Sequence, residues 1–512
     1  MRLPRSLATA AWVLVSALSM AGCGSLPSLD GRTATHALVD TAGTPLGQAI
    51  APQARKHPGQ TGIVDIEDGR AAFGMRVLLA RAATRSIDIQ TFIWHDDVTG
   101  TVLYEAVLRA AERGVRVRLL LDDANTMGLD PIFALLDAQP NIELRLYNPF
   151  VGRRSRAVGY LGDFERLNHR MHNKSFTVDN QVAVVGGRNI ADEYFEAGQD
   201  TSFADVDVMA VGAVVRSVSA EFDLYWNSAS AYPARLIVDR SAPVSREDFA
   251  KRAQAVIDSP DNSGYKEAIR RTTQIQSLLA GELKAEWTTA RVVNDDPAKT
   301  LAPGSETELQ LLPKLVALFG SPATGLNMVS PYFVPGEAGT KALSAIARRG
   351  VEVRILTNSL AATDEVSVHS GYARRRADLL RAGVQLFEIK PTATVIRQRA
   401  AEIGSHSQAG LHAKTFEVDR KSIFVGSFNL DPRSAKLNTE MGLVIDSPAL
   451  ATRLSSMFDR ASPDLAWRVT LDDNGDPEWH DGATTLHSDP EASWGRRLKV
   501  RIFSWLPIEW LL

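Results

Sequence analysis

The stretch of sequence that decides the fold is His172-Asn-Lys174-Ser-Phe-Thr-Val-Asp179, which returns later as His412-Ala-Lys414-Thr-Phe-Glu-Val-Asp419. Both copies read H-x-K-x-x-x-x-D, and the second begins 240 positions after the first. The same offset relates the flanking pairs Phe176/Phe416, Val178/Val418, Gly186/Gly426 and Asn189/Asn429. One such motif is weak, but two copies, each followed by a short strand and a Gly-x-x-Asn turn, indicate two similar half-domains. Each half-domain is expected to bring one His and one Lys to a shared site.

The segments before each motif repeat as well. In the first half, hydrophobic spacing predicts a helix at Ala71–Ala83, a strand at Ser86–Trp94, a helix at Thr101–Arg113 and a strand at Val115–Leu121. The second half matches this order with a strand at Leu326–Phe333, a helix at Thr340–Arg349 and a strand at Val351–Leu356. Gly114 and Gly350 follow the two matched helices as C-caps. The order of elements predicts an α/β fold with parallel strands joined by right-handed crossovers.

The bulk composition is that of a globular protein. The chain has 512 residues, which is more than one hydrophobic core usually supports, so two or three units are expected. Hydrophobic residues make up 45% and charged residues 23%. The net charge of −3 supplies no global positive field, which counts against a nucleic-acid enzyme, although a local basic groove is still compatible with one.

The single cysteine, Cys23, closes an N-terminal segment typical of a secretory signal. A short basic start precedes an almost wholly apolar run from Leu7 to Leu18, and small residues stand directly before the cysteine. This order resembles the lipobox of bacterial lipoproteins, with Met20 where Leu is commoner. Cleavage would leave Cys23 as an acylated N-terminus, and Gly24 in place of Asp favours the outer membrane of a Gram-negative bacterium. An ordinary signal peptide with an incidental cysteine is the alternative.

The remaining sequence suggests the domain layout. Residues 24–60 have no sustained period, and residues 496–512 are basic first and then aromatic and apolar. This last segment is expected either to lie at a membrane interface or to form a strap packed on the body. No later window holds about 18 uninterrupted apolar residues, so no spanning helix is expected. The predicted layout is a signal peptide at 1–22, a lipidated tether at 23–60, a first lobe at 61–244, linking helices at 245–300, a second lobe at 301–468 and a C-terminal tail at 469–512.

The spacing inside each motif suggests its chemistry. In a strand, His172 and Lys174 point to one face because they are two residues apart, and the same holds for His412 and Lys414. Two imidazoles and two ammonium groups around one point suit a phosphate whose non-bridging oxygens gain charge in the transition state. One imidazole can attack phosphorus while the other protonates the leaving alkoxide. The motif therefore predicts a phosphohistidine intermediate without a metal.

The motif aspartates and four further polar residues complete the candidate site. Asp179 and Asp419 fall at the turns beyond their strands, where they are expected to fix the turn or pair with neighbouring donors. Four further residues were assigned as candidate substrate-binding or histidine-holding groups, namely Asn189, Asn429, Glu440 and Asp205. The asparagines lie on Gly-rich turns and are expected to donate to the phosphate oxygens. Glu440 is expected to hold His412, and Asp205 to be its counterpart for His172.

Metal and cofactor sites are not predicted. His169 and His172 are three residues apart, so in a strand they face opposite sides. No third potential metal ligand occurs at a matching spacing. No cofactor motif is present, so neither a metal nor a cofactor is expected.

With these residues in view, the chain resembles the phospholipase D superfamily, whose members carry two such HKD motifs. The stretches around His95, Asp123, Lys174, Ile190 and Ser434 look most like bacterial cardiolipin synthases, especially the lipoproteins of the C type. The resemblance implies two pseudo-symmetric phospholipase D-like lobes, each a mainly parallel mixed sheet flanked by helices, with one shared active site. It places His172, Lys174, Asp179, His412, Lys414 and Asp419 at the family's catalytic motif positions.

The resemblance also implies an activity. A phosphatidyl group held on one histidine would pass to the glycerol hydroxyl of phosphatidylglycerol, with phosphatidylglycerol or phosphatidylethanolamine as donor. The expected partners are phospholipids at a membrane of the cell envelope, with no nucleic acid, while an accessory protein and the identity of the nucleophilic histidine are left open. The alternatives are a phospholipase D hydrolase releasing phosphatidic acid, an extracytoplasmic nucleic-acid phosphodiesterase and a degenerate binding protein.

Overall fold

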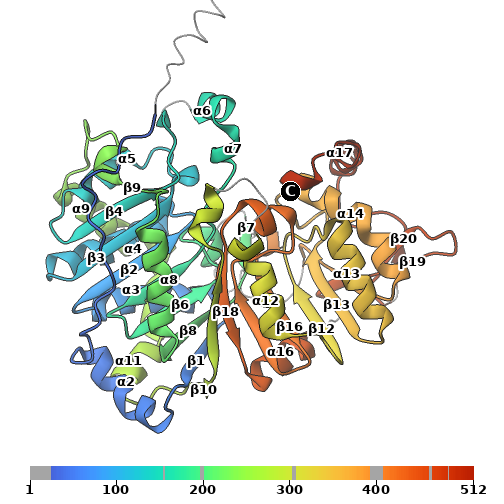
Figure 1. Cartoon of the computed structure of the whole chain (residues 1–512), viewed down its shortest axis with the longest axis horizontal. Helices are drawn as coiled ribbons and strands as arrows, with labels where there is room; N and C mark the ends of the chain where they lie inside the picture. Colours follow the sequence, from blue (N-terminus) through green and yellow to red (C-terminus); the bar gives the residue numbers. More distant parts are fainter. Residues whose placement is uncertain are drawn as a thin grey trace, which may run out of the picture.

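The computed structural model describes residues 25–153, 156–196, 201–301, 307–392, 408–459, 464–482 and 484–512. Cys23 and the predicted signal peptide lie outside the described residues. Figure 1 shows two lobes side by side, the first coloured blue to green and the second yellow to red. The sequence prediction of two similar α/β lobes is confirmed.

The first lobe is built on a nine-stranded sheet. Its strands in spatial order are β10 (Glu286–Thr288), β1 (Thr61–Ile66), β8 (Asp207–Gly212), β6 (Val182–Gly186), β5 (Ser175–Val178), β2 (Ser86–Thr91), β3 (Arg116–Asp122), β4 (Ile142–Tyr147) and β9 (Ala231–Pro233). Its helices are α2 (Pro45–Lys56), α3 (Gly69–Ala82), α4 (Val98–Glu112), α5 (Asp130–Asp137), α6 (Arg156–Gly162), α7 (Phe164–Leu167), α8 (Val215–Trp226), α9 (Arg246–Asp258), α10 (Ser263–Arg271) and α11 (Gln274–Leu279).

The second lobe has a ten-stranded sheet with the same central order. Its strands are β11 (Ala290–Asn294), β18 (Met441–Ile445), β17 (Ser422–Gly426), β16 (Thr415–Val418), β12 (Gly325–Val329), β13 (Glu352–Asn358), β14 (Gln385–Ile389), β19 (Ala466–Leu471), β20 (Pro477–His480) and β21 (Thr485–Leu486). Its helices are α12 (Leu311–Phe319), α13 (Gly336–Arg348), α14 (Val366–Arg381), α16 (Pro448–Asp459) and α17 (Trp494–Trp505). A small parallel sheet of β7 (Thr201–Ala204) and β15 (Gln408–Leu411) joins the two lobes.

The parallel share of each sheet is smaller than the sequence predicts. Among the described strands, parallel pairing is confined to β2–β3–β4 in the first sheet and to β12–β13–β14 in the second. The predicted crossover helices join β2 to β3 and β12 to β13, and α5 and α14 provide further crossovers from β3 to β4 and from β13 to β14. The strands that follow each motif return through tight turns and therefore pair antiparallel. Each sheet is mixed, as expected, but most of its pairings are antiparallel.

The two sheets meet through one shared apolar layer. Strands β6 and β8 of the first lobe contact β17 and β18 of the second. Val185 and Val208 on one side and Val425 and Leu443 on the other belong to a single buried cluster. Because this layer excludes water from both sheets, it fixes how the lobes sit relative to one another.

Three segments depart from the predicted layout. The expected tether contains helix α2, which buries Leu46 and Ile50, and the Arg32 guanidinium donates to backbone oxygens of the first lobe. The expected linking helices α9, α10 and α11 pack against α3, α4 and α2 of the first lobe. The chain crosses from one sheet to the other between β10 and β11. The C-terminal tail adds β20 and β21 to the second sheet and packs α17 on α14.

The motif aspartates hold turns, as their spacing predicts. Asp179 has a φ of 51° and Asn180 one of 50°, values typical of hairpin turns that favour Asn and Asp. The Asp179 carboxylate accepts hydrogen bonds from the backbone N–H groups of Thr84, Arg85 and Ser86. Asp419 does the same for Ala323, Thr324 and Gly325. Both aspartates bind backbone at the start of a central strand, and among the described residues neither carboxylate forms a hydrogen bond with a histidine. Their place among the catalytic groups stays a prediction.

We expect Asp179→Ala to lower the free energy of unfolding by about 2–4 kcal/mol, because Asp179 is fully buried and its loss orphans several backbone donors. Asp419→Ala is the matched control at the same position of the partly exposed second turn, where water replaces the lost acceptor. Denaturant unfolding followed by circular dichroism measures both. Equal losses in the two variants would contradict this dependence on burial.

Candidate active site

Each histidine lies just before the strand that its own motif contains. His172 precedes β5 and His412 precedes β16, and both are buried. The Lys174 ammonium donates to the backbone oxygen of His172 at 2.6 Å, and Lys414 makes the same bond to the backbone oxygen of His412. The backbone therefore ties each lysine to its own histidine. Both residues lie before the strand and not within it, so the predicted shared face of a strand stays untested.

Each histidine is held by the opposite lobe. The Nδ1 atom of His172 lies 2.8 Å from Oε2 of Glu440, and Nδ1 of His412 lies 2.6 Å from Oδ2 of Asp205. The backbone repeats this exchange, because the His172 N–H donates to the oxygen of Thr439 and the His412 N–H donates to the oxygen of Ala204. Two neighbouring residues of one lobe thus fix both the main chain and the ring of the other lobe's histidine.

This crossing corrects the sequence assignment. Glu440 was expected to hold His412, and Asp205 to hold His172. The structure exchanges both partners, and it places both acids behind the rings instead of among the substrate-binding groups. Spacing along the chain missed the exchange because it compares residues within one lobe.

These hydrogen bonds between the lobes also identify the tautomer of each histidine ring. A carboxylate only accepts hydrogen bonds, so each Nδ1 carries the proton and each Nε2 keeps its lone pair. Nε2 is the atom on the other side of the ring from the carboxylate. It is therefore the atom available for reaction with a substrate.

The two acid sites differ in one detail that sequence reasoning missed. The Ser427 hydroxyl donates to Oε2 of Glu440 at 2.5 Å. The position at the same offset in the first lobe is Gly187, where an added Cβ would stand 2.3 Å from the Asp205 carboxylate. The two copies read Gly-Ser-Phe-Asn and Gly-Gly-Arg-Asn, and this difference is the signal that could have pointed to Ser427.

A buried ion pair supports Glu440 from behind. The backbone N–H of Glu440 donates to Oδ2 of Asp295, and the Lys299 ammonium lies 2.9 Å from Oδ1 of the same carboxylate. Burial raises the pKa of Asp295 to about 6. Both residues come from the segment expected to be a linker, and no motif in the sequence marked them.

The four basic groups weaken one another's charge. Burial, together with Lys174 and Lys414, lowers the pKa of His172 well below its usual range. Burial and the Lys414 charge lower the pKa of His412 to about 4. Burial lowers the pKa of Lys174 to about 7 and that of Lys414 to about 8. An anion bound among these groups would offset both the burial and the repulsion.

The pKa values of the two acids shift in opposite directions. Burial raises the pKa of Glu440 to about 7. Burial acts in the same direction on Asp205, but the charge and hydrogen bond of His412 outweigh it and lower the pKa of Asp205 to about 2. His412 therefore has a fully ionised partner at neutral pH, whereas His172 has a weaker one.

Aromatic rings pack against the histidines, and the two predicted asparagines are buried. The Phe92 ring meets His172 edge-on at 5.2 Å between centroids, and Tyr194 and Phe203 lie 4.9 and 5.3 Å from His412. Asn189 and Asn429 are both buried. Oδ1 of Asn189 accepts from the Ile93 N–H at 3.3 Å, and Oδ1 of Asn429 has no hydrogen-bond partner among the described residues. Their expected bonds to phosphate stay a prediction.

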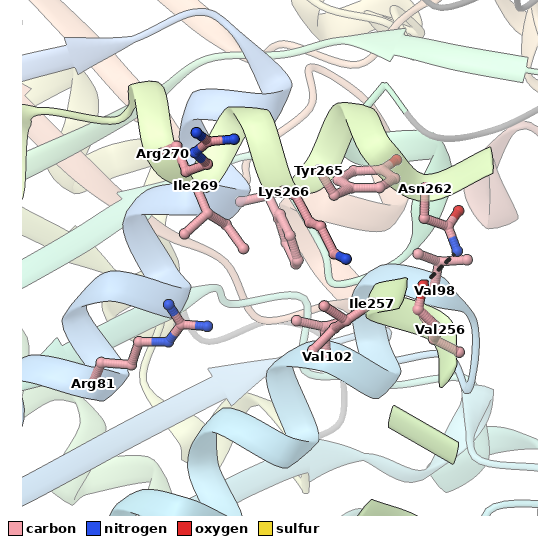
Figure 2. A pocket seen from close by; sticks show the side chains of 11 residues that line it. Arg81, Val98, Val102, Val256, Ile257, Asn262, Tyr265, Lys266, Ile269 and Arg270 are labelled. Carbon is pink, nitrogen blue, oxygen red and sulfur yellow. Dashed lines mark hydrogen bonds between the residues drawn. The ribbon is translucent and has the colours of Figure 1, made fainter. Parts of the chain in front are cut away.

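Two other features contain none of the motif residues. Among the described residues, His95, Asp97 and Glu193 could bring ligand atoms within 4.8 Å of one another, but Asp97 already caps α4 by accepting from Gly100. A mostly apolar cavity of about 360 Å³ lies between α3, α4, α9 and α10. Figure 2 shows the side chains that line it. None of the motif residues lines it. No described helix is both long and apolar enough to cross a membrane.

Comparisons with known proteins agree with the repeat. A family model described as "Cardiolipin synthase, PLD-like domain" matches residues 77–226 and again residues 315–462. Cardiolipin synthase C of Escherichia coli (strain K12) is 45% identical over 478 residues, which cover 91% of this chain and 99% of the relative. Cardiolipin synthase A of Pseudomonas entomophila (strain L48) is 28% identical over 412 residues, or 80% of this chain and 70% of the relative.

A solved structure shares the fold. Phosphatidylserine synthase of Haemophilus influenzae Rd KW20 superposes with a TM-score of 0.57 at 13% identity, covering 91% of this chain and 100% of that one. This likeness concerns the fold alone. Because the family model matches both halves of the chain, and the Escherichia coli relative aligns along nearly all of it, the protein belongs to the cardiolipin synthase family with phospholipase D-like domains.

Proposed function

We propose that this protein is a phosphatidyltransferase of the cardiolipin synthase type, which passes a phosphatidyl group to a hydroxyl of phosphatidylglycerol. The crossed histidine–carboxylate pairs carry the proposal, because they leave both Nε2 atoms free of the carboxylates while the charges of Lys174 and Lys414 act on both rings. Membership of the family and the likeness to cardiolipin synthase C of Escherichia coli support it.

The first step forms a bond between phosphorus and a histidine. The Nε2 lone pair of His172 attacks phosphorus, and the bond from phosphorus to the leaving headgroup oxygen breaks. That oxygen keeps the bonding electrons and takes a proton from Nε2 of His412, which gains this second proton when the bound phosphate anion raises the pKa of the ring. Lys174 and Lys414 stabilise the charge that builds on the non-bridging oxygens.

The second step reverses these roles. His412 removes the proton from the acceptor hydroxyl, whose oxygen bonds to phosphorus. The bond from phosphorus to His172 breaks, and its electrons return to the ring. His412 suits the acid–base role because the ionised Asp205 stabilises its imidazolium, whereas the higher pKa of Glu440 makes it a weaker partner for a charged His172.

We further propose the substrates and the place of the enzyme. The donor is phosphatidylglycerol, which releases glycerol, or phosphatidylethanolamine, which releases ethanolamine. Cys23 is the acylated N-terminus of a lipoprotein that faces the periplasm from the outer membrane, as the signal and lipobox pattern suggests. The site works without metal, cofactor or nucleic acid, because its own lysines supply the positive charge.

We expect cardiolipin to appear in a cardiolipin-deficient bacterium that expresses this chain, and not in the same strain expressing His412→Ala, because the variant lacks the acid–base group. Lipid analysis of the two strains gives the measurement. Phosphatidic acid accumulating in place of cardiolipin would move the assignment to a hydrolase. No change in either lipid, with the protein folded and exported, would reject a self-sufficient transferase.

The two histidines are separable with a substrate whose leaving group needs no proton. With phosphatidyl-p-nitrophenol, we expect His412→Ala to release about one equivalent of p-nitrophenol per enzyme in a burst and then to stall, because the intermediate on His172 lacks its base. His172→Ala should give no burst. A burst from His172→Ala and none from His412→Ala would exchange the two roles.

The loss of activity at alkaline pH should follow the deprotonation of the two lysines. Phosphate binding needs their protonated forms, which are present below the pKa of each group and are lost as pH rises through about 7 for Lys174 and about 8 for Lys414. We therefore expect kcat/KM to fall above neutral pH. Lys174→Arg should move this limb up toward the pKa of Lys414, because a guanidinium stays charged. An alkaline limb that does not move would exclude Lys174 as its source.

A further inference from the structure

The C-terminal helix α17 has one face fixed to the body. Val500 is buried in a small cluster with Leu360 and Ala492. The Arg496 guanidinium donates to the backbone oxygen of Leu360 at 2.9 Å, and Arg497 donates to the backbone oxygen of Asp489. This side of the helix is the packed strap that the sequence allowed as one of two outcomes.

The opposite face of α17 is apolar and exposed. Trp494, Leu498, Ile502 and Trp505 are 76, 40, 51 and 88% exposed. Their spacing of four, four and three residues places them along a single stripe of the helix. Trp510, just beyond the helix, is 55% exposed. A stripe with several large apolar side chains in water marks an interaction surface.

The first lobe carries a second exposed apolar group near the C-terminus. Leu161 in α6 is 89% exposed and Phe164 in α7 is 48% exposed. Figure 1 shows α6, α7, α17 and the C-terminus along one edge of the molecule, where the dark blue start of the described chain also lies. We call the outward side chains of α6, α7, α17 and residues 506–512 the docking edge.

The docking edge adjoins the active site through Arg433. The Arg433 N–H donates to the Leu512 oxygen at 2.8 Å, and its side-chain Nε donates to the Leu511 oxygen. The same guanidinium lies 2.7 Å from Oδ1 of Asn168, which follows α7 and precedes His172 by four residues. One side chain therefore joins both parts of the edge to the segment that carries a catalytic histidine.

The charge along α17 favours an anionic partner. Lys499 and Arg501 are exposed beside the apolar stripe, and neither forms an ion pair with another described residue. An apolar face with Trp at its ends and cations at its sides is the pattern of a helix that lies in the interface of an anionic bilayer.

We propose that the docking edge seats on an anionic phospholipid bilayer and presents the histidine site to it. This inference rests on the proposed function and deepens it by naming the surface through which the lipid substrate arrives. Insertion of the Trp and Leu side chains would orient the protein so that a lipid reaches the histidines while its acyl chains stay close to the bilayer.

The test uses the full chain with Cys23→Ser, so that no lipid anchor masks weaker binding. We expect this protein to bind vesicles of phosphatidylglycerol and phosphatidylcholine more tightly than vesicles of phosphatidylcholine alone. Trp494→Ser with Trp505→Ser should weaken binding about tenfold or more, because two large apolar side chains no longer leave water. Leu224→Ser with Val316→Ser is the matched control, since both side chains are exposed elsewhere, at 54 and 58%.

Activity measured on vesicles and on a soluble substrate distinguishes a loss of membrane docking from damage to the fold. The tryptophan variant should lose transfer on vesicles and keep wild-type turnover on a soluble short-chain phospholipid. Unchanged vesicle binding by the tryptophan variant, or an equal loss by the control, would overturn the proposal, and so would an equal loss of activity on the soluble substrate. Tryptophan-dependent binding in a protein that transfers no phosphatidyl group would retain the docking edge and reject the proposed function instead.

Discussion

The structure depends on an exchange between its lobes, in which each motif histidine is held by a carboxylate of the opposite half. Glu440 fixes the ring of His172 and Asp205 that of His412, while the residues just before these acids bind the backbone of the same histidines. Neither lobe can therefore orient its own histidine. The shared apolar layer between the two sheets sets the registration that these bonds require, so packing far from the reactive atoms controls their geometry.

Burial of four basic groups at one point destabilises their charged forms. This destabilisation favours the binding of an anion. Desolvation holds the pKa values of both histidines and both lysines down in the free protein, and repulsion from the lysine charges adds to this for the two histidines and Lys174. A phosphate diester brings the negative charge that these groups lack. The same buried basic groups therefore bind the substrate and stabilise the charge of the transition state. They are already in position before the anion binds. The unequal acids then break the symmetry between two otherwise similar halves.

The supporting residues show why the halves are not interchangeable. Gly187 leaves room for Asp205, whereas Ser427 at the equivalent position donates to Glu440. Asp295 and Lys299 support Glu440 from a segment between the lobes. On the outside, Arg433 links the C-terminal residues to the segment before His172, so the edge with exposed aromatic side chains is continuous with the site.

The sequence by itself determined the repeat, the α/β class, the strand–helix–strand core, the turn role of Asp179 and Asp419, and the pairing of each histidine with its lysine. These features follow from local periodicity and from spacing within one segment. It did not determine the antiparallel share of the sheets, the packing of α2 and α9–α11, or the partners of the histidines. Sequence spacing assigned Glu440 to His412 because both lie in one half. Only the tertiary structure decided the exchange, because the contact joins residues 268 positions apart across an interface that exists once both lobes have folded.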